Sequence, residues 1–430
     1  MNRKILLVGL LFALMPTSIF AQKQRSQAFR DKYTLKEAVI LSRHNIRAPL
    51  STKGSLLEQV TTHPWFEWTA GASELTTHGG ALENQFGLYF RKWSVDAGLF
   101  KENATPSRNE VLIYANSMQR CIATANYFTT ALFPVADVHV NHRFVPSKMD
   151  PVFFPQLTKS SKSFRAQAMK EIAAMGGKKG IIGINEGLKE SYEITAKVLD
   201  LKDSPACKEK NLCAFDNYNT QLILEKGDEP RMKGSLKDAT TCSDALILQF
   251  YEEPDAKKAA FGHDITLDDW TKISKIKDVY GDVLFTAPVV SVNVAHPLLV
   301  YMRDELMDKD RKLAFLCGHD SNIASVTAAL EVEPYDLPNT IEKKTPIGCK
   351  LVIEKFEGKD GNMYCDINLT YQSTDQLRNI AMLSLKNPPQ IFPLSLKGLQ
   401  KNADGLYLLK DVEGRFMKAI RAYDKIEDEF

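Results

Sequence analysis

The stretch that most constrains the fold is EAVILSRHNIRAPL, at residues 37–50. An uninterrupted apolar run, residues 38–41, is followed at once by Arg43, His44 and Arg47. A short β-branched and aliphatic run of this kind is typical of a strand buried on both faces of a parallel sheet. Ligands of open α/β sheets bind beyond the carboxyl ends of the strands. The stretch therefore predicts a strand that ends in a charged, ligand-binding loop.

The residue types in this loop suit phosphate chemistry. The planar guanidinium group of arginine matches phosphate oxygens, and a neutral imidazole between two guanidinium groups can attack phosphorus. The loop therefore predicts a phosphoryl-transfer site in which His44 is the nucleophile.

Two more predicted strands end in residues of the same kind. The strand at 111–115 leads to Arg120 at the start of a helix, where anions are favoured, and the strand at 313–317 leads to His319 and Asp320. On spacing alone, an arginine in such a turn is more often a surface residue, and an aspartate in such a position suits a helix N-cap. What favours the functional interpretation is that three strands each end in groups that phosphoryl transfer requires.

These segments also resemble a known family. RHNIRAP, at residues 43–49, is similar to the RHGxRxP signature of the histidine acid phosphatases, and CGHDSNIAS, at 317–325, supplies the His-Asp pair that accompanies it. Asn45 is the form found in the bacterial glucose-1-phosphatase branch, which is related to the phytases. Further similar stretches are LTTHGG, YANSMQR, KDSPACKEK, LFTAP, TPIG and QLRN. The resemblance extends from residue 37 to about residue 380.

The resemblance implies an acid phosphatase that hydrolyses sugar phosphate monoesters, with glucose 1-phosphate as the leading substrate. His44 would form a phosphohistidine and Asp320 would protonate the leaving oxygen. The residues expected to hold the phosphate are Arg43, Arg47, Arg120 and His319. No metal or cofactor is expected, because arginines neutralise the phosphate. The other histidines, which form no HxH or HExxH pattern and are expected in structural or surface roles, are His63, His78, His139, His142, His263 and His296.

Two positions are expected to shape the substrate pocket. Glu252, in LILQFYEE, matches a pocket-facing glutamate of the glucose-1-phosphatase branch, although Glu253 and Pro254 depart from the glycine that follows in the family. A solvated helix residue is the alternative interpretation of Glu252. Asn45 adds a side chain where most phytase-type members have glycine, and it is expected to narrow the mouth of the site.

The amino terminus predicts export. Arg3 and Lys4 precede an apolar segment at residues 5–15, which is too short to span a bilayer. We expect residues 1–21 to be a signal peptide, giving a periplasmic or secreted protein without a membrane anchor. The alternative is an N-terminal core helix, although no polar residue interrupts the segment to create an amphipathic face.

Export places the seven cysteines in an oxidising compartment, where an odd number leaves at least one thiol free or paired between chains. Cys207 and Cys213 bracket five polar residues and predict a local disulfide, and the family resemblance points the same way. A zinc site is the alternative, but no nearby pattern completes four ligands. Cys349 and Cys365 flank a predicted hairpin whose turn would place Cys365 opposite Glu354, so these two cysteines are not expected to pair.

The fold class predicted is α/β, a mostly parallel central sheet flanked by helices with an inserted smaller α-helical domain. Residues 149–281, which are rich in lysine and poor in β-branched runs, would form the insert between the two parts of the α/β domain, 22–148 and 282–430. With 55 basic and 53 acidic side chains, the chain has no overall field to recruit nucleic acid or a membrane surface. The expected partner is a small phosphate ester, with no obligate protein partner.

Three other functions remain open at this level. Phytase activity uses the same machinery, so the positional preference on inositol phosphates and the physiological substrate are not decided by sequence. A periplasmic protein that binds sugar phosphates without turnover would not need both a nucleophile and an acid. Phosphoglycerate mutase chemistry shares the histidine nucleophile but fits an exported chain poorly.

Overall fold

The computed structural model describes residues 25–50, 54–145 and 147–428, so the predicted signal peptide lies outside the described residues. In the described chain, a mixed sheet of eight strands has the order β10-β8-β7-β1-β6-β2-β3, with β9 beside β8. Its strands are β1 (Tyr33–Arg43), β2 (Val111–Ala115), β3 (Val140–Asn141), β6 (Leu313–Gly318), β7 (Lys350–Gly358), β8 (Met363–Tyr371), β9 (Gln390–Pro393) and β10 (Tyr407–Leu408). A separate two-stranded sheet consists of β4 (Gln221–Ile223) and β5 (Arg231–Lys233).

The parallel half of the sheet contains the three strands predicted to carry the site. β6 lies between β1 and β2 and is parallel to both. Arg43 pairs with Gly318, and Ala115 pairs with Cys317, so the three strands end at the same level. The α/β prediction is confirmed. The other half of the sheet is antiparallel, which makes the sheet mixed.

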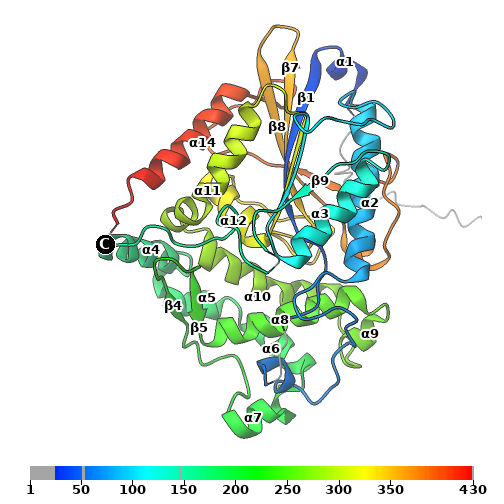
Figure 1. Cartoon of the computed structure of the whole chain (residues 1–430). Coiled ribbons are helices and arrows are strands. Elements are labelled where there is room, and N and C mark those ends of the chain that lie inside the picture. Colours follow the sequence, from blue (N-terminus) through cyan, green and yellow to red (C-terminus); the bar gives the residue numbers. More distant parts are fainter. Residues whose placement is uncertain (1–24, 51–53, 146, 429–430) are drawn as a thin grey trace, which may run out of the picture.

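Helices cover both faces of the sheet because the residues of β1 alternate between two cores. Ala38 and Ile40 pack toward α2 and α3, whereas Val39 and Leu41 pack toward α11, α12 and α14. Figure 1 shows these two helical layers on opposite sides of the strands. The covering helices are α2 (Thr77–Asp96), α3 (Gln119–Leu132), α11 (Pro288–Met307), α12 (Asp320–Ala329) and α14 (Leu409–Asp424). Short helices α1 (Gln27–Arg30) and α13 (Thr374–Arg378) complete this part.

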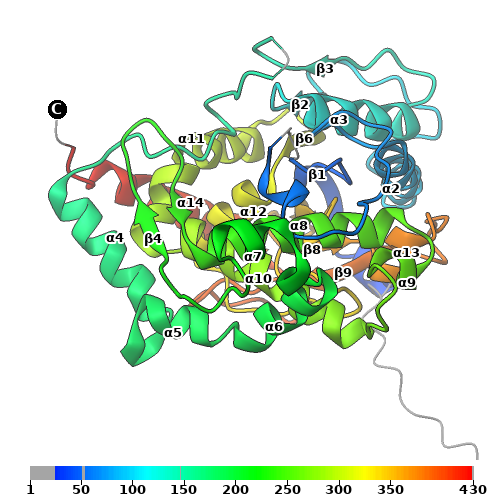
Figure 2. The ribbon, with the colours of Figure 1, turned by 90° about the horizontal axis from the view of Figure 1, so that it is seen from below.

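A third group of helices lies beyond the carboxyl ends of the parallel strands, below the sheet in Figure 1. Figure 2, seen from that side, shows α7, α8 and α10 in front of the strand ends. The helices are α4 (Lys162–Ala174), α5 (Ile181–Glu186), α6 (Lys189–Val198), α7 (Pro205–Lys210), α8 (Ser235–Glu252), α9 (Ala256–Ala259) and α10 (Leu267–Phe285). They share a hydrophobic core that also includes Ile46, from the loop after β1. The division into domains at residues 148 and 281 stays a prediction, and the second boundary falls inside α10.

The hairpin of β7 and β8 differs from its prediction by one residue. Cys365 pairs with Lys355 rather than with Glu354. The amide of Gly358 donates to the carbonyl of Asn362 (2.8 Å), which leaves a loop of residues 359–361 closed by Gly361 at φ 78°. Three-residue hairpin loops commonly end in such a left-handed glycine, and the odd loop length moves the register.

Cys207 and Cys213 are linked by a disulfide, and the other five cysteines are free and buried. Cys349 and Cys365 are among the free ones, as expected.

Within the described ranges no single helix is long and apolar enough to cross a membrane. Only α10 and α11 taken together reach that length and composition, and they meet at an angle of 84°.

Candidate active site

His44 is held at the carboxyl end of β1 as a neutral imidazole. Its backbone amide donates to the carbonyl of Gly318 (2.9 Å), which ties the loop to the end of β6. Its Nδ1 lies 2.8 Å from the carbonyl oxygen of Asn45. Because a carbonyl oxygen only accepts, Nδ1 carries the ring proton and Nε2 keeps its lone pair. Burial lowers the pKa of His44 well below its ordinary value, and the positive charges of Arg120 and the other surrounding side chains lower it further. Nε2 therefore keeps its lone pair and can act as a nucleophile.

Arg43 is a fixed cation beside this imidazole. The side chain is 3% exposed, and its guanidinium donates to a carboxylate oxygen of Glu342 (2.8 Å) and to the carbonyl of Thr345. Burial by itself would lower the pKa of Arg43, but the charges of Glu342 and Asp320 outweigh that effect and raise it. Arg43 is therefore charged and oriented before any substrate arrives.

Arg47 and Arg120 differ in how far their charge is already balanced. Arg47 pairs with Asp244 of α8 (2.9 Å). Arg120, the second residue of α3, donates to the hydroxyl of Ser73 (2.6 Å), and no described carboxylate lies within ion-pair distance of it. Its Nε has no hydrogen-bond partner, and burial lowers its pKa. Arg120 thus keeps the most capacity to bind an anion.

His319 and Asp320 follow β6 and face the same space. The side-chain amide nitrogen of Asn116 lies 2.7 Å from His319 Nε2 and can donate to it. The rings of His44 and His319 have centroids 5.3 Å apart. At the start of α12, Asp320 Oδ1 accepts from the amide of Ser321 (2.9 Å).

The other oxygen of Asp320 faces two cations. Oδ2 lies 3.4 Å from Arg43 and 3.4 Å from Lys277. Burial raises the pKa of Asp320, but Arg43 and Lys277 lower it more, to well below its usual value. Asp320 is therefore ionised in the free protein even in mildly acidic solution.

The residues predicted from the three strand ends line one cavity of about 450 Å³ between the sheet and the third group of helices. They are Arg43, His44, Arg47, Arg120, His319 and Asp320. Level strand ends explain the convergence, because parallel neighbours deliver their following loops to one edge of the sheet. Asp320 is partly open to solvent, with 37% of its side chain exposed.

Sequence reasoning missed Lys277, which contacts three carboxylates. Its ammonium nitrogen lies 3.3 Å from Glu342, 3.4 Å from Asp320 and 3.6 Å from Asp244. Nothing in the local sequence distinguishes it from the other lysines of α10. Lys277 reaches these three carboxylates only because α10 crosses the ends of the strands.

Glu342 and Asp244 were missed for the same reason. Burial opposes their ionisation, but Lys277 acts on Glu342 and Arg47 acts on Asp244, and each has a lowered pKa as a result. Asp278 and Asp282 also line the cavity, and burial raises their pKa values to about 7 and about 6. The cavity thus contains carboxyl groups of both kinds, ionised and easily protonated.

The two positions expected to shape the pocket do not reach it. Glu252 lies at the end of α8, 3.5 Å from His78, and does not line the cavity. Asp244 is the last of the four α8 residues that line the cavity, and Glu252 follows it by eight residues, or about 12 Å of helix. The assignment of Glu252 to substrate binding therefore stays a prediction, and the structure places its carboxylate beside His78.

Asn45 points away from the cavity and cannot narrow its mouth. Its side chain is fully buried, and its amide nitrogen donates to Glu83 of α2 (3.0 Å). The backbone of Gly348, at φ 70°, approaches so closely that a Cβ there would lie 2.6 Å from this nitrogen. Asn45 therefore holds the loop in place from the side opposite the cavity, through its hydrogen bond to α2.

Comparisons with known proteins agree with this geometry. The profile of the Histidine phosphatase superfamily (branch 2) matches residues 34–375. The chain is 38% identical to a glucose-1-phosphatase of Salmonella typhimurium, covering 94% of this chain and 96% of that protein. It is 39% identical to a glucose-1-phosphatase of Providencia rettgeri, covering 90% and 92%. The solved structure of the Hafnia alvei phytase matches with a TM-score of 0.83 at 26% identity, covering 91% of this chain and 98% of that one.

Proposed function

The chain belongs to branch 2 of the histidine phosphatase superfamily, the histidine acid phosphatases, and we propose that it hydrolyses glucose 1-phosphate through a phosphohistidine. It is a phosphomonoesterase of the glucose-1-phosphatase type. The observation that carries the proposal is the state of His44, a buried neutral imidazole. Its Nδ1 is hydrogen-bonded to a backbone carbonyl, so the lone pair of its Nε2 is available beside three arginines.

Binding would begin with the phosphate dianion entering the cavity. Arg43 and Arg47 are already oriented by carboxylates, whereas Arg120 still has a hydrogen-bond donor without a partner. Arginine suits this task because its rigid fork matches phosphate oxygens. His319 lines the same cavity and can add a further hydrogen bond to the phosphate. Together these groups would neutralise the oxygens that carry charge in the transition state.

In the first chemical step, His44 Nε2 would bond to phosphorus while the bond from phosphorus to the sugar oxygen breaks. The leaving alkoxide would take a proton from Asp320, and general acid help of this kind is typically worth about 10²–10⁴ in rate. Asp320 must first acquire that proton. A bound phosphate dianion competes for Arg43 and adds negative charge beside the carboxyl, and both effects raise the pKa of Asp320 above its value in the free protein.

In the second step, water would attack the phosphohistidine and return His44 to its neutral form. Asp320, now ionised, would accept a proton from that water and release it to solvent when the phosphate leaves, so both groups end as they are in the free protein. Inorganic phosphate and the sugar are then released.

The charges of the cavity wall favour a substrate with one phosphate. Beyond the arginines, the lining has Lys237, Lys277 and Lys344, but it also has Glu229, Asp244 and Asp282. A wall of mixed sign repels the additional phosphates of inositol hexakisphosphate more than a fully basic wall would. Phytase activity remains the second candidate because of the fold shared with a phytase.

Specificity constants decide between these two substrates. We expect kcat/KM for glucose 1-phosphate to exceed those for hexose 6-phosphates and for phytate at each of several acidic pH values. A larger kcat/KM for phytate would identify the chain as a phytase instead.

The covalent step is tested by trapping. Wild-type protein mixed with ³²P-labelled glucose 1-phosphate and quenched in alkaline detergent, where the N–P bond survives, should carry label on His44. His44→Ala should abolish both label and turnover, whereas His142→Ala, an exposed histidine outside the cavity, should keep both. Label on another residue, or turnover without label, would refute the phosphohistidine.

We also propose a periplasmic or secreted location. The disulfide between Cys207 and Cys213 supports it, because disulfides persist in oxidising compartments. Cell fractionation would test the location, and recovery of the protein with the cytoplasmic markers would contradict it.

A further inference from the structure

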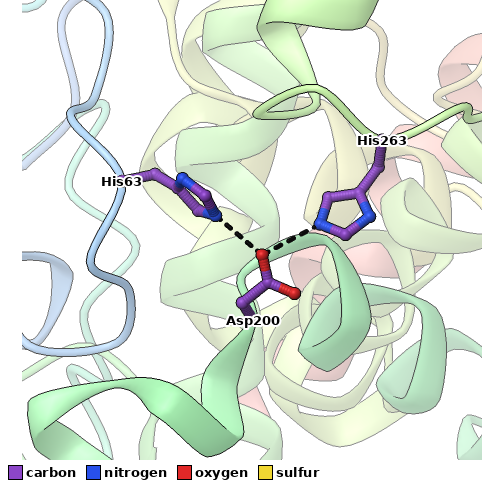
Figure 3. A group of neighbouring side chains, drawn as sticks. All are labelled: His63, Asp200 and His263. Atoms are coloured by element: carbon purple, nitrogen blue, oxygen red, sulfur yellow. Dashed lines mark hydrogen bonds and ion pairs between the residues drawn. The ribbon is translucent and has the colours of Figure 1, made fainter.

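A second cluster of chemically capable side chains lies away from the catalytic cavity, where three distant segments meet (Figure 3). His63 comes from the loop between β1 and α2, Asp200 follows α6, and His263 lies between α9 and α10. Both imidazoles direct Nε2 to the same oxygen, Asp200 Oδ2, at 2.7 Å from His63 and 3.1 Å from His263. None of the three residues lines the catalytic cavity.

The spacing of these atoms suits a small divalent ion. The two ring nitrogens and the carboxylate oxygen all lie within 4.8 Å of one another. Ligand atoms about 2.0 Å from a tetrahedral zinc lie about 3.3 Å apart, which is close to the 2.7 and 3.1 Å that separate the two nitrogens from Asp200 Oδ2. Two imidazoles and a carboxylate form a set that zinc and neighbouring transition metals favour over calcium or magnesium.

Asp200 is directed toward the histidines by its backbone. It precedes a short helical turn, a position where an aspartate usually accepts from the first amides of the helix, but its side chain makes no such capping bond. Its φ of 47° is left-handed, a conformation that aspartate tolerates better than most residues. The carboxylate is therefore free to face the two imidazoles.

Both histidines are also positioned by their surroundings. The His63 ring stacks on Phe261 with centroids 5.1 Å apart, and Trp65 packs edge-on against the same phenyl ring. Phe261 and Gly262 both have positive φ, 52° and 92°, and this turn brings His263 back toward Asp200. Rings held in this way have little conformational freedom left to lose when an ion binds.

We propose that His63, Asp200 and His263 form a binding site for a divalent transition-metal ion, with Zn²⁺ as the ion of matching chemistry. Each neutral imidazole would bind through Nε2 and carry its proton on Nδ1. The side chains are 23% to 37% exposed, which leaves room for water as a fourth ligand. This assignment goes beyond the expectation from sequence, which gave both histidines structural or surface roles.

The site would tie the loop after the nucleophile to the third group of helices. That loop, at residues 54–75, already contacts those helices through Gln59, which accepts from the amide of Ala206 (2.8 Å). The amide of Phe66 adds a bond to Gln249 (2.8 Å). A metal ion would add a third, stronger connection in a segment that ends near Ser73, the partner of Arg120. Its expected effect is on stability, because no ligand touches the cavity.

Calorimetric titration of chelator-treated protein with ZnCl₂ at pH 7.5 tests the site. Wild type should bind one equivalent and gain thermal stability. His63→Ala and His263→Ala should each weaken binding by about a hundredfold or more, because such sites spread their binding free energy over few ligands. His142→Ala should bind as wild type does. Lack of stoichiometric binding, or binding that both ligand variants retain, would overturn the proposal.

A second measurement needs no variant. Anomalous diffraction from wild-type crystals soaked in ZnCl₂ should show a peak among the three ligand atoms, and a peak only elsewhere would refute the site. Hydrolysis of glucose 1-phosphate by the chelator-treated protein tests the catalytic proposal independently of the metal site. Turnover should persist without the metal, so either proposal can fail while the other stands.

Discussion

Two groups of buried charges lie on opposite sides of the same loop, and they differ in how completely the charges are balanced. Behind the loop, Glu83 and Lys350 form an ion pair (2.7 Å) in which both side chains are fully buried. Lys350 also donates to Ser42 and to the carbonyl of Gly348, and Glu83 also accepts from Asn45. In front of the loop, the catalytic cavity leaves Arg120 without a carboxylate among the described residues.

This difference shows that burial of charge does not by itself mark a functional site. Lys350 is balanced one to one, and its ammonium group lies 4.3 Å from the ring centre of Phe86, with no room for a ligand. In the cavity, Arg43 and Arg120 each have an Nε without a hydrogen-bond partner. Arg120, which also lines the cavity, has no carboxylate partner among the described residues, and an anion can exploit a positive charge that is left unbalanced in this way. We therefore expect substitutions of Glu83 or Lys350 to change stability, and substitutions in the cavity to change turnover.

The largest effect is expected from Asp320→Asn. Loss of the general acid should slow hydrolysis of glucose 1-phosphate by about 10²–10⁴. Hydrolysis of p-nitrophenyl phosphate should slow much less, because its leaving group departs with little help. Asn can still accept from the amide of Ser321, so the start of α12 should be preserved. Steady-state kinetics on the two substrates measure the difference.

Asp278→Asn and Asp282→Asn are the matched controls, because burial keeps these carboxyls easily protonated in the same cavity. Neither should show the dependence on the leaving group. If one of them does and Asp320→Asn slows both substrates equally, the acid is that residue and not Asp320.

The next largest effect is expected from Lys350→Met. It leaves Glu83 buried without its partner, so the free energy of unfolding should fall by about 3–5 kcal/mol. Adding Glu83→Gln should restore most of that loss, since the double variant has no unpaired buried charge. Urea denaturation measures both variants.

The exposed pair of Lys189 and Glu193 provides the control for Lys350. Lys189→Met should change the free energy of unfolding by less than about 0.5 kcal/mol. The comparison between the two charge groups would fail if Lys350→Met removed turnover while leaving stability intact.

The smallest effect is expected from Lys277→Met, and it is a shift in pH dependence. Lys277 lowers the pKa of Asp320, so its removal should raise that pKa. Asp320 in the substrate complex would then stay protonated to higher pH, and the alkaline limb of kcat, which reports groups in that complex, should move upward by about one pH unit, given partial screening by solvent. The acid limb, set by His44, should stay below pH 6.5 in either protein.

Lys275→Met, in the same helix, should leave the whole profile unchanged, because Lys275 contacts only the carbonyl of Gly187 among its described hydrogen bonds. A downward shift of the alkaline limb in Lys277→Met would mean that Asp320 is not the titrating group.

Much of the site could be predicted from sequence because its placement follows from local patterns. Residues 111–115 and 313–317 are short apolar runs followed by polar residues, and parallel strands of this kind end at one edge of a sheet. Once β1, β2 and β6 are neighbours, Arg120 and His319 must approach His44. The helix α2 also depends on local signals, since Thr76 caps its start and Gly98, at φ 75°, follows its end.

Tertiary structure alone decided which charges meet across long stretches of chain. Lys277 reaches Asp320, 43 residues away, and Glu342, 65 residues away, only because α10 crosses the strand ends. Asn45 lies between two residues of the cavity, yet turns to Glu83. The direction of the Asn45 side chain depends on the space that the neighbouring backbone leaves, and no local sequence pattern encodes that space.

The cluster of His63, Asp200 and His263 illustrates the same limit. The residues are 137 and 63 positions apart in sequence and come from three loops, so they form no spacing motif. Sequence determined β1, β2 and β6 and the residues that follow them, because these depend on neighbours in the chain. The balance of each buried charge, and the choice of which histidines share a carboxylate, depend on packing between segments, and only the folded structure determines that packing.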